Sequence, residues 1–116
     1  MGSKMSDDIF SKIAQGEIEV PIVDSNEYAV AFADINPQAP VHLLVIPKKK
    51  FLNVTELAAD STYMQAVMSL AVSAASKAGL TNGYRLVFNT GQDGGQTVPY
   101  VHCHVLGGRS LTWPPG

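Results

Sequence analysis

Two of the three histidines in this 116-residue chain, His102 and His104, lie two positions apart near its C-terminal end. Tyr100 precedes them at the same spacing, and the apolar residues Val101 and Cys103 stand between them. Successive side chains of a β-strand point to opposite faces, so this alternation predicts a strand with one polar face. Its two imidazoles would lie about 7 Å apart along the strand. Neighbouring imidazoles are typical of a catalytic site or a metal site.

A glycine-rich segment, GQDGGQT over residues 91–97, leads into this strand. Gly91, Gly94 and Gly95 can adopt backbone angles that aim N–H groups inward, and Thr97 adds a hydroxyl. Such donors stabilise a phosphate without a lysine. A histidine becomes a nucleophile when an acceptor holds one ring nitrogen protonated and the other is left free. A phosphate cradle next to paired histidines therefore favours attack on phosphorus.

Zinc binding is the alternative for the same residues. Zinc accepts three neutral imidazoles at about 2.0–2.1 Å with one open position. The third histidine, His42, lies in an apolar segment in which Leu43 and Val45 have the opposite parity, so three histidines can converge if the two strands are neighbours. The remaining residues of ligand type near the pair are Asp93 and Tyr100. We expect that no metal and no other cofactor is required.

The single cysteine, Cys103, falls on the apolar face of the predicted strand. We expect it to be buried and inert, because desolvation opposes the thiolate. One cysteine allows no internal disulfide and suits a reducing compartment. These features predict a cytoplasmic protein, small enough to enter a nucleus.

Composition predicts one folded domain. The chain is 46% hydrophobic and 16% charged, and a chain of this length can bury a core of its own. The net charge of −2 draws it neither to nucleic acid nor to an acidic membrane surface, and no apolar run approaches about 18 residues. We expect residues 1–5 to be a leader left from expression or a disordered N-terminus, and residues 6–116 to form the domain.

Periodicity and turn residues predict two helices and about five strands. Ser6 can cap the first helix and Gly16 can end it; Gly79 can end the second. The apolar positions of the second helix recur at helical spacing: Tyr63, Val67, Leu70 and Ala74. The expected elements are a helix over 6–17, two strands within 20–36, a strand over 40–47, a helix over 61–78, and strands over 84–90 and 100–108. This order predicts an α+β domain with one five-stranded antiparallel sheet and two helices.

Several separated motifs resemble one family. VHCHVLGGR, with DGGQT before it and WPPG at the end, is similar to the histidine triad (HIT) superfamily. The segments FADINPQAPVHLLVIPKK and GLTNGYRLVFNTG agree with the same superfamily, and the similarity is greatest to its Hint branch, the histidine triad nucleotide-binding proteins. The resemblance covers nearly the whole chain.

The resemblance implies a fold and an activity. Hint proteins are α+β domains that pair as homodimers and join two five-stranded sheets into ten strands. They bind purine nucleoside monophosphates and hydrolyse phosphoramidates, such as adenosine 5′-phosphoramidate, to the monophosphate and an amine through a nucleotidyl-histidine. Dinucleoside polyphosphate hydrolysis, an activity of the sister Fhit branch, is disfavoured by the WPPG ending.

The resemblance also implies roles for individual residues. His102 matches the nucleophile, His104 the histidine at the phosphate and leaving group, and His42 a further histidine of the site. Asp34 matches the ribose ligand and Trp113 a residue near the active site of the partner subunit. The catalytic set comprises His102, His104, His42 and Thr97. The nucleotide-binding set comprises the apolar base pocket (Ile9, Phe10, Ile13, Phe32, Ile35), Asp34, Asn89, Gly95, Gln96, Thr97, Val98, His102 and His104.

Tyr100 departs from the family pattern, which has histidine at the first position of the motif. A phenol donates a hydrogen bond but titrates near about 10, so it is not a cation at neutral pH. We expect His102 to keep its role at a reduced rate. The alternative is a purine-nucleotide-binding dimer with weak or no turnover.

Overall fold

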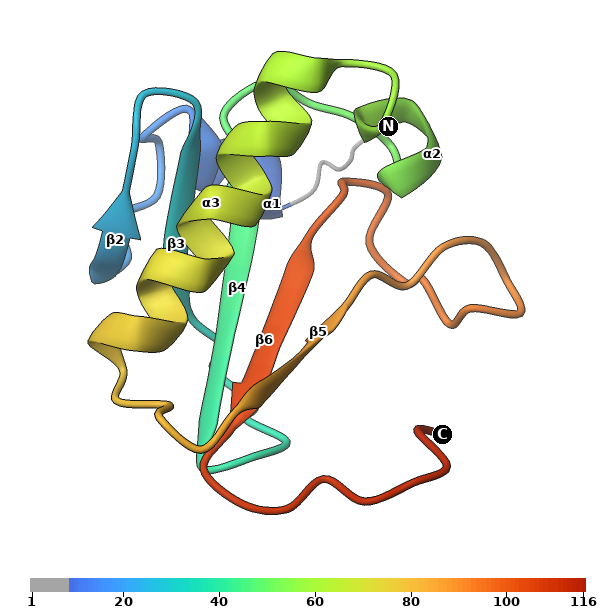
Figure 1. The fold of residues 1–116 in the computed structure, drawn as a ribbon. Coiled ribbons are helices and arrows are strands. Elements are labelled where there is room, and N and C mark those ends of the chain that lie inside the picture. The colour runs from blue at the N-terminus through green and yellow to red at the C-terminus, as the bar shows by residue number, and fades with distance from the viewer. Residues whose placement is uncertain (1–8) are drawn as a thin grey trace.

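The structure, a computed structural model, describes residues 9–116 and contains one five-stranded antiparallel sheet in the order β2-β3-β4-β6-β5 (Figure 1). In chain order the elements are α1 (Ile9–Ala14), β2 (Ile22–Ser25), β3 (Ala29–Ala33), β4 (Val41–Pro47), α2 (Val54–Leu57), α3 (Ser61–Lys77), β5 (Tyr84–Val87) and β6 (Cys103–Gly107). The predicted fold class is confirmed. The described residues hold three helices, however, where two were expected.

The short helices differ from the prediction. The helix expected over 6–17 is observed as α1, and its proposed cap Ser6 lies outside the described residues. Gly16 follows α1 with φ 76°, a left-handed conformation that suits glycine and ends the helix. The unpredicted helix α2 has only four residues, too few for a periodic pattern. Its signal is local: Asn53 Oδ1 accepts from Glu56 N, and Glu56 Oε1 accepts from Leu52 N.

The long helix α3 agrees with the expected range within one residue. The Asp60 side chain accepts from the amide of Tyr63 and caps it. At the other end Gly79 takes φ 79°, and Leu80 N donates to Ala75 O, the closing bond of a helix C-terminus. Within residues 9–116, no helix is both long and apolar enough to cross a membrane.

The sheet separates two apolar clusters. The first lies under α3 and includes Val67 and Leu70 of the helix with Val45, Cys103 and Val105 of the sheet (Figure 1). The second lies on the opposite face, where α1 packs, and its buried members are Phe10, Ile13, Phe32, Leu44, Ile46 and Tyr100. Alternation along β4 and β6 therefore assigns neighbouring residues to different clusters, as the sequence predicts.

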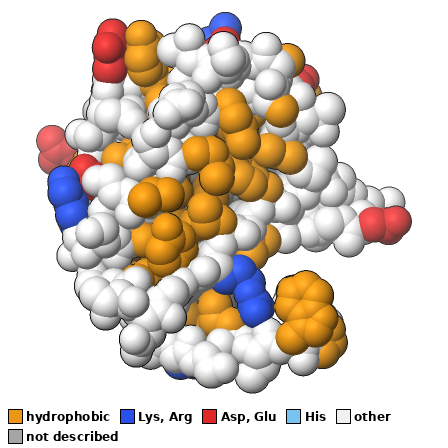
Figure 2. Space-filling view, viewed as in Figure 1, with side chains coloured by type: hydrophobic (Ala, Val, Ile, Leu, Met, Phe, Trp, Pro, Cys, Tyr) orange, Lys and Arg blue, Asp and Glu red, His pale blue; other side chains and the backbone are white. Residues whose placement is uncertain are grey.

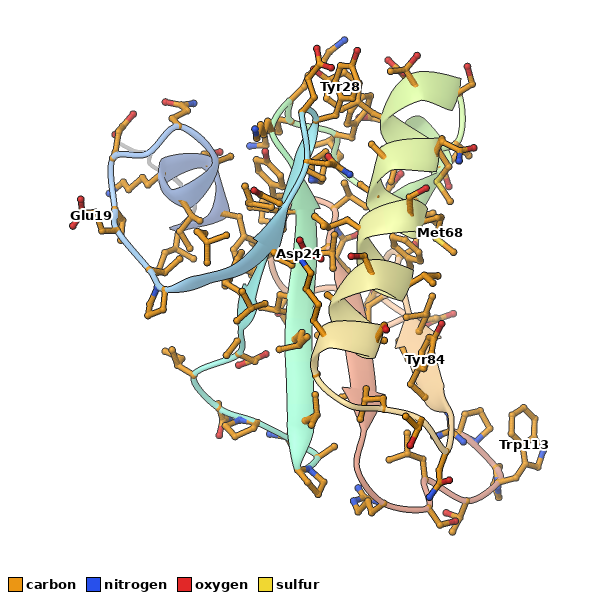
Figure 3. The ribbon with its side chains drawn as sticks, turned by 60° about the vertical axis from the view of Figure 1, so that its left-hand side comes forward. Glu19, Asp24, Tyr28, Met68, Tyr84 and Trp113 are labelled. Carbon is orange, nitrogen blue, oxygen red and sulfur yellow. The ribbon has the colours of Figure 1, made fainter. Side chains whose placement is uncertain are left out.

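A polar contact fastens the outer strand β2 to α3. Asp24 lies between its strand and α3 (Figure 3). It accepts hydrogen bonds from Ser73 Oγ at 2.6 Å and from Lys77 Nζ at 2.8 Å. These bonds favour the ionised carboxylate and hold the pKa of Asp24 below its usual range. The contact closes one side of the layer between helix and sheet.

Two strands are shorter than expected. The strand predicted over 84–90 ends at Val87, and the strand predicted over 100–108 begins at Cys103. The β4–β6 ladder stops at the pair Val45 and Cys103. Continuing it by two residues would bring Pro47 into the ladder, and proline has no N–H to donate. Tyr100 nevertheless lies on the same face as the histidines, so the predicted alternation holds beyond the strand.

Candidate active site

The three histidines converge on the face of the sheet opposite α3. β4 and β6 pair with Leu44 opposite His104, which makes His42 and His104 diagonal neighbours. His42 Nε2 lies 2.8 Å from His104 Nδ1. The rings of His102 and His104 are 4.9 Å apart between centroids, closer than the spacing of an ideal strand. The expected convergence is confirmed.

Hydrogen bonds select the tautomer of His42. The amide of Gln38 donates to His42 Nδ1 at 3.0 Å, so this nitrogen has no proton. The proton of the neutral ring is therefore on Nε2, where it is donated to His104 Nδ1. His104 must then carry its own proton on Nε2. The carbonyl of Gln38 is held in turn by Arg109 Nη2 at 3.2 Å.

His102 has the opposite tautomer. Its Nδ1 lies 2.8 Å from the carbonyl oxygen of Tyr100, which can only accept, so Nδ1 is protonated and Nε2 keeps a free lone pair. The side chain is buried, and Phe10 packs against it with ring centroids 5.0 Å apart. Burial lowers the pKa of His102, although the bond to Tyr100 and the charge of Asp34 oppose this. A neutral imidazole with one free nitrogen is a nucleophile.

His104 is also held neutral. Burial lowers its pKa to about 4, and repulsion from His102 and His42 adds to the effect, against the attraction of Asp34. With Nδ1 occupied by His42, the free protein presents His104 as an uncharged N–H donor. The two histidines predicted on one strand thus differ: His102 offers the lone pair of Nε2, and His104 offers an N–H at Nε2.

Asp34 completes the cluster at the end of β3. Its amide donates to the carbonyl of His42 at 3.0 Å, and its Oδ2 lies 3.4 Å from His42 Nε2. Its Oδ1 accepts from Asn36 N at 2.8 Å, which orients the carboxylate. The sequence predicts a ribose role for Asp34 through the family resemblance, and the structure places the carboxylate beside the histidines.

The metal alternative is changed by this geometry. The ligand atoms of Asp34, His42 and His104 lie within 4.8 Å of one another. The third possible metal ligand is therefore Asp34 and not His102. Asp93 is exposed on its loop. Two nitrogens bound to one tetrahedral zinc ion are about 3.3 Å apart, from bonds of about 2.0–2.1 Å. The 2.8 Å between His42 and His104 fits a shared proton, and zinc would require the rings to separate.

The glycine-rich loop is built for close packing. Gly91 and Gly95 have φ 70° and 77°, where other residues are strained. A side chain at Gly94 would collide with the backbone carbonyl of Thr90. Asn89 Nδ2 donates to the carbonyl of Gly94 at 2.7 Å. Asn89, expected at the phosphate, therefore holds the loop itself in this structure.

The backbone donors of the loop are fewer than expected. The amide of Gly95 donates to Gln92 O at 3.1 Å, and that of Gln96 donates to Gly91 O at 3.0 Å. The loop's own turns use both groups, so the expectation that they face a phosphate is wrong for this conformation. Thr97 is exposed, and within residues 9–116 neither its amide nor its hydroxyl makes a hydrogen bond to the protein.

The side chain of Gln96 also serves the loop. Its Nε2 donates to the carbonyls of Leu52 at 2.6 Å and Val98 at 3.0 Å, which ties the loop to the segment before α2. The Val98 amide, like that of Thr97, makes no hydrogen bond within the described chain. Gln96 was expected to bind nucleotide, and the structure instead places it as a brace.

An apolar cavity of about 510 Å³ lies beside the histidines. All five predicted base-pocket residues and Asp34 line it. Phe10 and Phe32 are buried, whereas Ile35 is 97% exposed at the rim. Leu44 also lines the cavity and was missed, although it shares the parity of His42 on β4. Phe10 lines the cavity and also packs against His102, so its ring joins the cavity wall to the histidine cluster.

Trp113 lies apart from these residues. It is 80% exposed in the C-terminal tail and points away from the ribbon (Figure 3). Arg85 holds this tail through the carbonyls of Leu111 at 3.4 Å and Thr112 at 2.5 Å. Among the described residues, no hydrogen bond or ring contact joins Trp113 to the histidines of its own chain.

Comparisons with known proteins find similarity along most of the chain. The sequence pattern of the HIT domain matches residues 15–111. An uncharacterised HIT-like protein of Synechococcus elongatus is 52% identical over 97% of the chain and its own full length. A 14 kDa zinc-binding protein of Zea mays is 45% identical over 93% of the chain and 87% of its own. The crystal structure of a HIT family hydrolase from Legionella pneumophila superposes with a TM-score of 0.87 at 47% identity, covering 93% of this chain and 98% of that one.

Proposed function

Since this chain belongs to the HIT domain family, we propose that it is a phosphoramidase of the Hint branch. It hydrolyses purine nucleoside phosphoramidates of the adenosine 5′-phosphoramidate type to a nucleoside monophosphate and an amine. The observation that carries the proposal is the bond between His102 Nδ1 and the Tyr100 carbonyl, which leaves Nε2 as the free nitrogen. The HIT family hydrolase of Legionella supports the broader assignment as a hydrolase.

Substrate binding uses three adjoining parts of the site. The purine enters the apolar cavity and packs against Phe10, whose buried ring also contacts His102. The ribose hydroxyls bind Asp34 at the cavity's edge. The phosphate faces the free amides of Thr97 and Val98, which supply donors without a cation. Apolar packing of this kind accepts adenine and guanine alike.

Reaction begins with attack of His102 Nε2 on the α-phosphorus. The bond from phosphorus to the amine breaks as the bond to Nε2 forms. The phosphoramidate nitrogen enters the site already protonated, so the amine takes the bonding electron pair and leaves as a neutral molecule. His102 becomes a nucleotidyl-imidazolium, whose Nδ1 keeps its proton and donates it in a hydrogen bond to the Tyr100 carbonyl. His104 donates from Nε2 to a phosphoryl oxygen and stabilises the charge that develops there.

Water completes the cycle. It attacks phosphorus from the side that the amine has left, and the bond to His102 breaks. The ring returns to its neutral tautomer. One proton of the water stays on the hydroxyl of the nucleoside monophosphate, and the other is released to solvent, where the departed amine can take it up. The chain supplies nucleophile and donors from its own residues, so we propose a reaction that needs no cofactor.

A homodimer is part of the proposal. β5 is an edge strand, and hydrophobic side chains gather over α3 and β5 in Figure 2. Val72 and Tyr84 are both exposed on this side. Unpaired edges and apolar patches favour association, and pairing along β5 would continue the sheet to ten strands. Trp113, exposed in the tail, would then approach the partner's site.

The test is amine release from adenosine 5′-phosphoramidate in the presence of a chelator, by the starting protein and by His102→Ala. We expect turnover that vanishes in the variant, while AMP binding measured by calorimetry is kept. Near-normal turnover by His102→Ala would defeat the assignment. A rate that depends on added zinc would favour a metal site at Asp34, His42 and His104. AMP binding without turnover would leave the silent nucleotide-binding dimer.

A further inference from the structure

We propose that Tyr100 is a positioning residue: its hydroxyl fastens the segment before β6 to the end of β4 and so holds the carbonyl that selects the tautomer of His102. The carbonyl in question is Tyr100's own main-chain oxygen, 2.8 Å from His102 Nδ1. The inference rests on the proposed function for its kinetic readout only.

The carbonyl lies outside the regular sheet. The β4–β6 ladder ends with Val45 and Cys103, so no strand pairing fixes residues 98–102. Backbone bonds hold the amides on either side, from Tyr100 N to Val98 O and from Val101 N to Phe51 O, both 2.8 Å. Neither bond reaches β4, the strand that carries His42.

The phenol makes the missing connection. Tyr100 Oη donates to the carbonyl of Pro47 at 2.5 Å, in a buried environment and across 53 positions of sequence. Pro47 is the last residue of β4, and its nitrogen has no proton to offer. The side chain thus continues the tie between the two strands past the point where the ladder stops.

The same ring supports the other face of His102. Tyr100 is 1% exposed and packs edge-on against Phe10, with 6.3 Å between ring centroids. Phe10 in turn packs against His102. Tyr100 therefore steadies both neighbours of the nucleophile, the carbonyl at Nδ1 and the aromatic ring beside it. A phenol does this as an uncharged donor at neutral pH, which suits a buried place.

Tyr100→Phe removes the hydroxyl and keeps the ring. We expect ¹⁵N spectra of labelled histidine to show His102 protonated on Nδ1 in the starting protein and the proton divided between both nitrogens in the variant. We expect kcat to fall about five- to tenfold, the worth of one hydrogen bond, with KM changed less than about twofold. A merely structural role would lower the melting temperature and leave the tautomer intact.

Val67→Ala is the matched control. It opens a cavity under α3, on the other face of the sheet, and should lower the melting temperature while the His102 tautomer and kcat are kept. If Tyr100→Phe does not fold, 4-fluorophenylalanine at position 100 supplies a second side chain without a donor that nearly fills the space of the hydroxyl. An unchanged His102 tautomer and kcat in either folded variant would overturn the inference. Absence of turnover in the starting protein would defeat the proposed function, whereas the spectra would still test Tyr100.

Discussion

Burial has opposite chemical consequences on the two faces of the sheet. On the α3 face, burial raises the pKa of the Cys103 thiol to about 12 and makes it inert. On the α1 face, burial lowers the pKa of His104 to about 4. Desolvation favours the neutral form in both cases. A neutral thiol has little reactivity, whereas a neutral imidazole can act as a nucleophile or as a hydrogen-bond donor. The same desolvation therefore makes Cys103 unreactive and leaves the histidines able to react.

The two faces also differ in how completely a helix covers them. The seventeen-residue helix α3 covers the Cys103 face and fills it with packed side chains. The six-residue helix α1 leaves a cavity of about 510 Å³ on the histidine face. The long helix therefore stabilises the fold, and the short helix leaves room for a ligand.

The largest expected contrast is in turnover. His102→Ala removes the nucleophile and should lower kcat for the phosphoramidate by at least about 10³-fold. Cys103→Ala, one residue away on the other face, should change kcat by less than about twofold, because its thiol meets no substrate. Steady-state assays of the two variants check this. A large loss of turnover in Cys103→Ala with the fold intact would break the distinction between the faces.

Large-to-small substitutions should separate stability from binding. Phe10→Ala on the cavity face and Leu70→Ala under α3 both remove buried apolar groups, and each should lower the free energy of unfolding by about 2–5 kcal/mol. Phe10→Ala should also weaken AMP binding by about tenfold or more, because an aromatic packing partner of the base is lost. Urea titration and calorimetry measure the two effects. Equal AMP affinities in the two variants would place the base elsewhere.

Acid should destabilise the protein through the histidine face. The unfolded chain protonates His104 as the pH falls below about 6.5, whereas the folded chain resists until about pH 4. Over this window the unfolded state binds more protons. The free energy of unfolding therefore decreases as the pH is lowered, by up to about 3 kcal/mol. Urea titrations at pH 7.5 and 4.5 should show the loss, and His104→Gln should reduce it. A rise in stability on acidification would contradict the buried neutral site.

Local chemistry and parity were enough to predict much of this arrangement. Alternation around His102 and His104 predicted the two faces and the buried Cys103. The opposite parity of Leu43 showed that His42 could join the pair if the two strands were neighbours, which the strand order meets. The same rule, applied to Leu44, would have added it to the cavity. These inferences succeed because the strand period is fixed by the backbone.

The rest depends on hydrogen bonds that the sequence does not display. The early end of the β4–β6 ladder at Val45 and Cys103 and the use of the Gly95 and Gln96 amides within the loop follow from the path of the chain in three dimensions. The bond from Gln38 N to His42, which selects the tautomers of His42 and His104, joins a loop amide to a strand side chain. α2 was missed because four residues carry no period.

The most direct test of the account is mass spectrometry of the protein during turnover of adenosine 5′-phosphoramidate, with the reaction stopped without acid. We predict an added adenylyl group on the peptide that contains both His102 and His104, assigned by fragmentation to His102 and absent from His102→Ala. An adenylyl group on His104, or rapid turnover with no modified histidine at any time, would contradict the assignment of His102 as nucleophile.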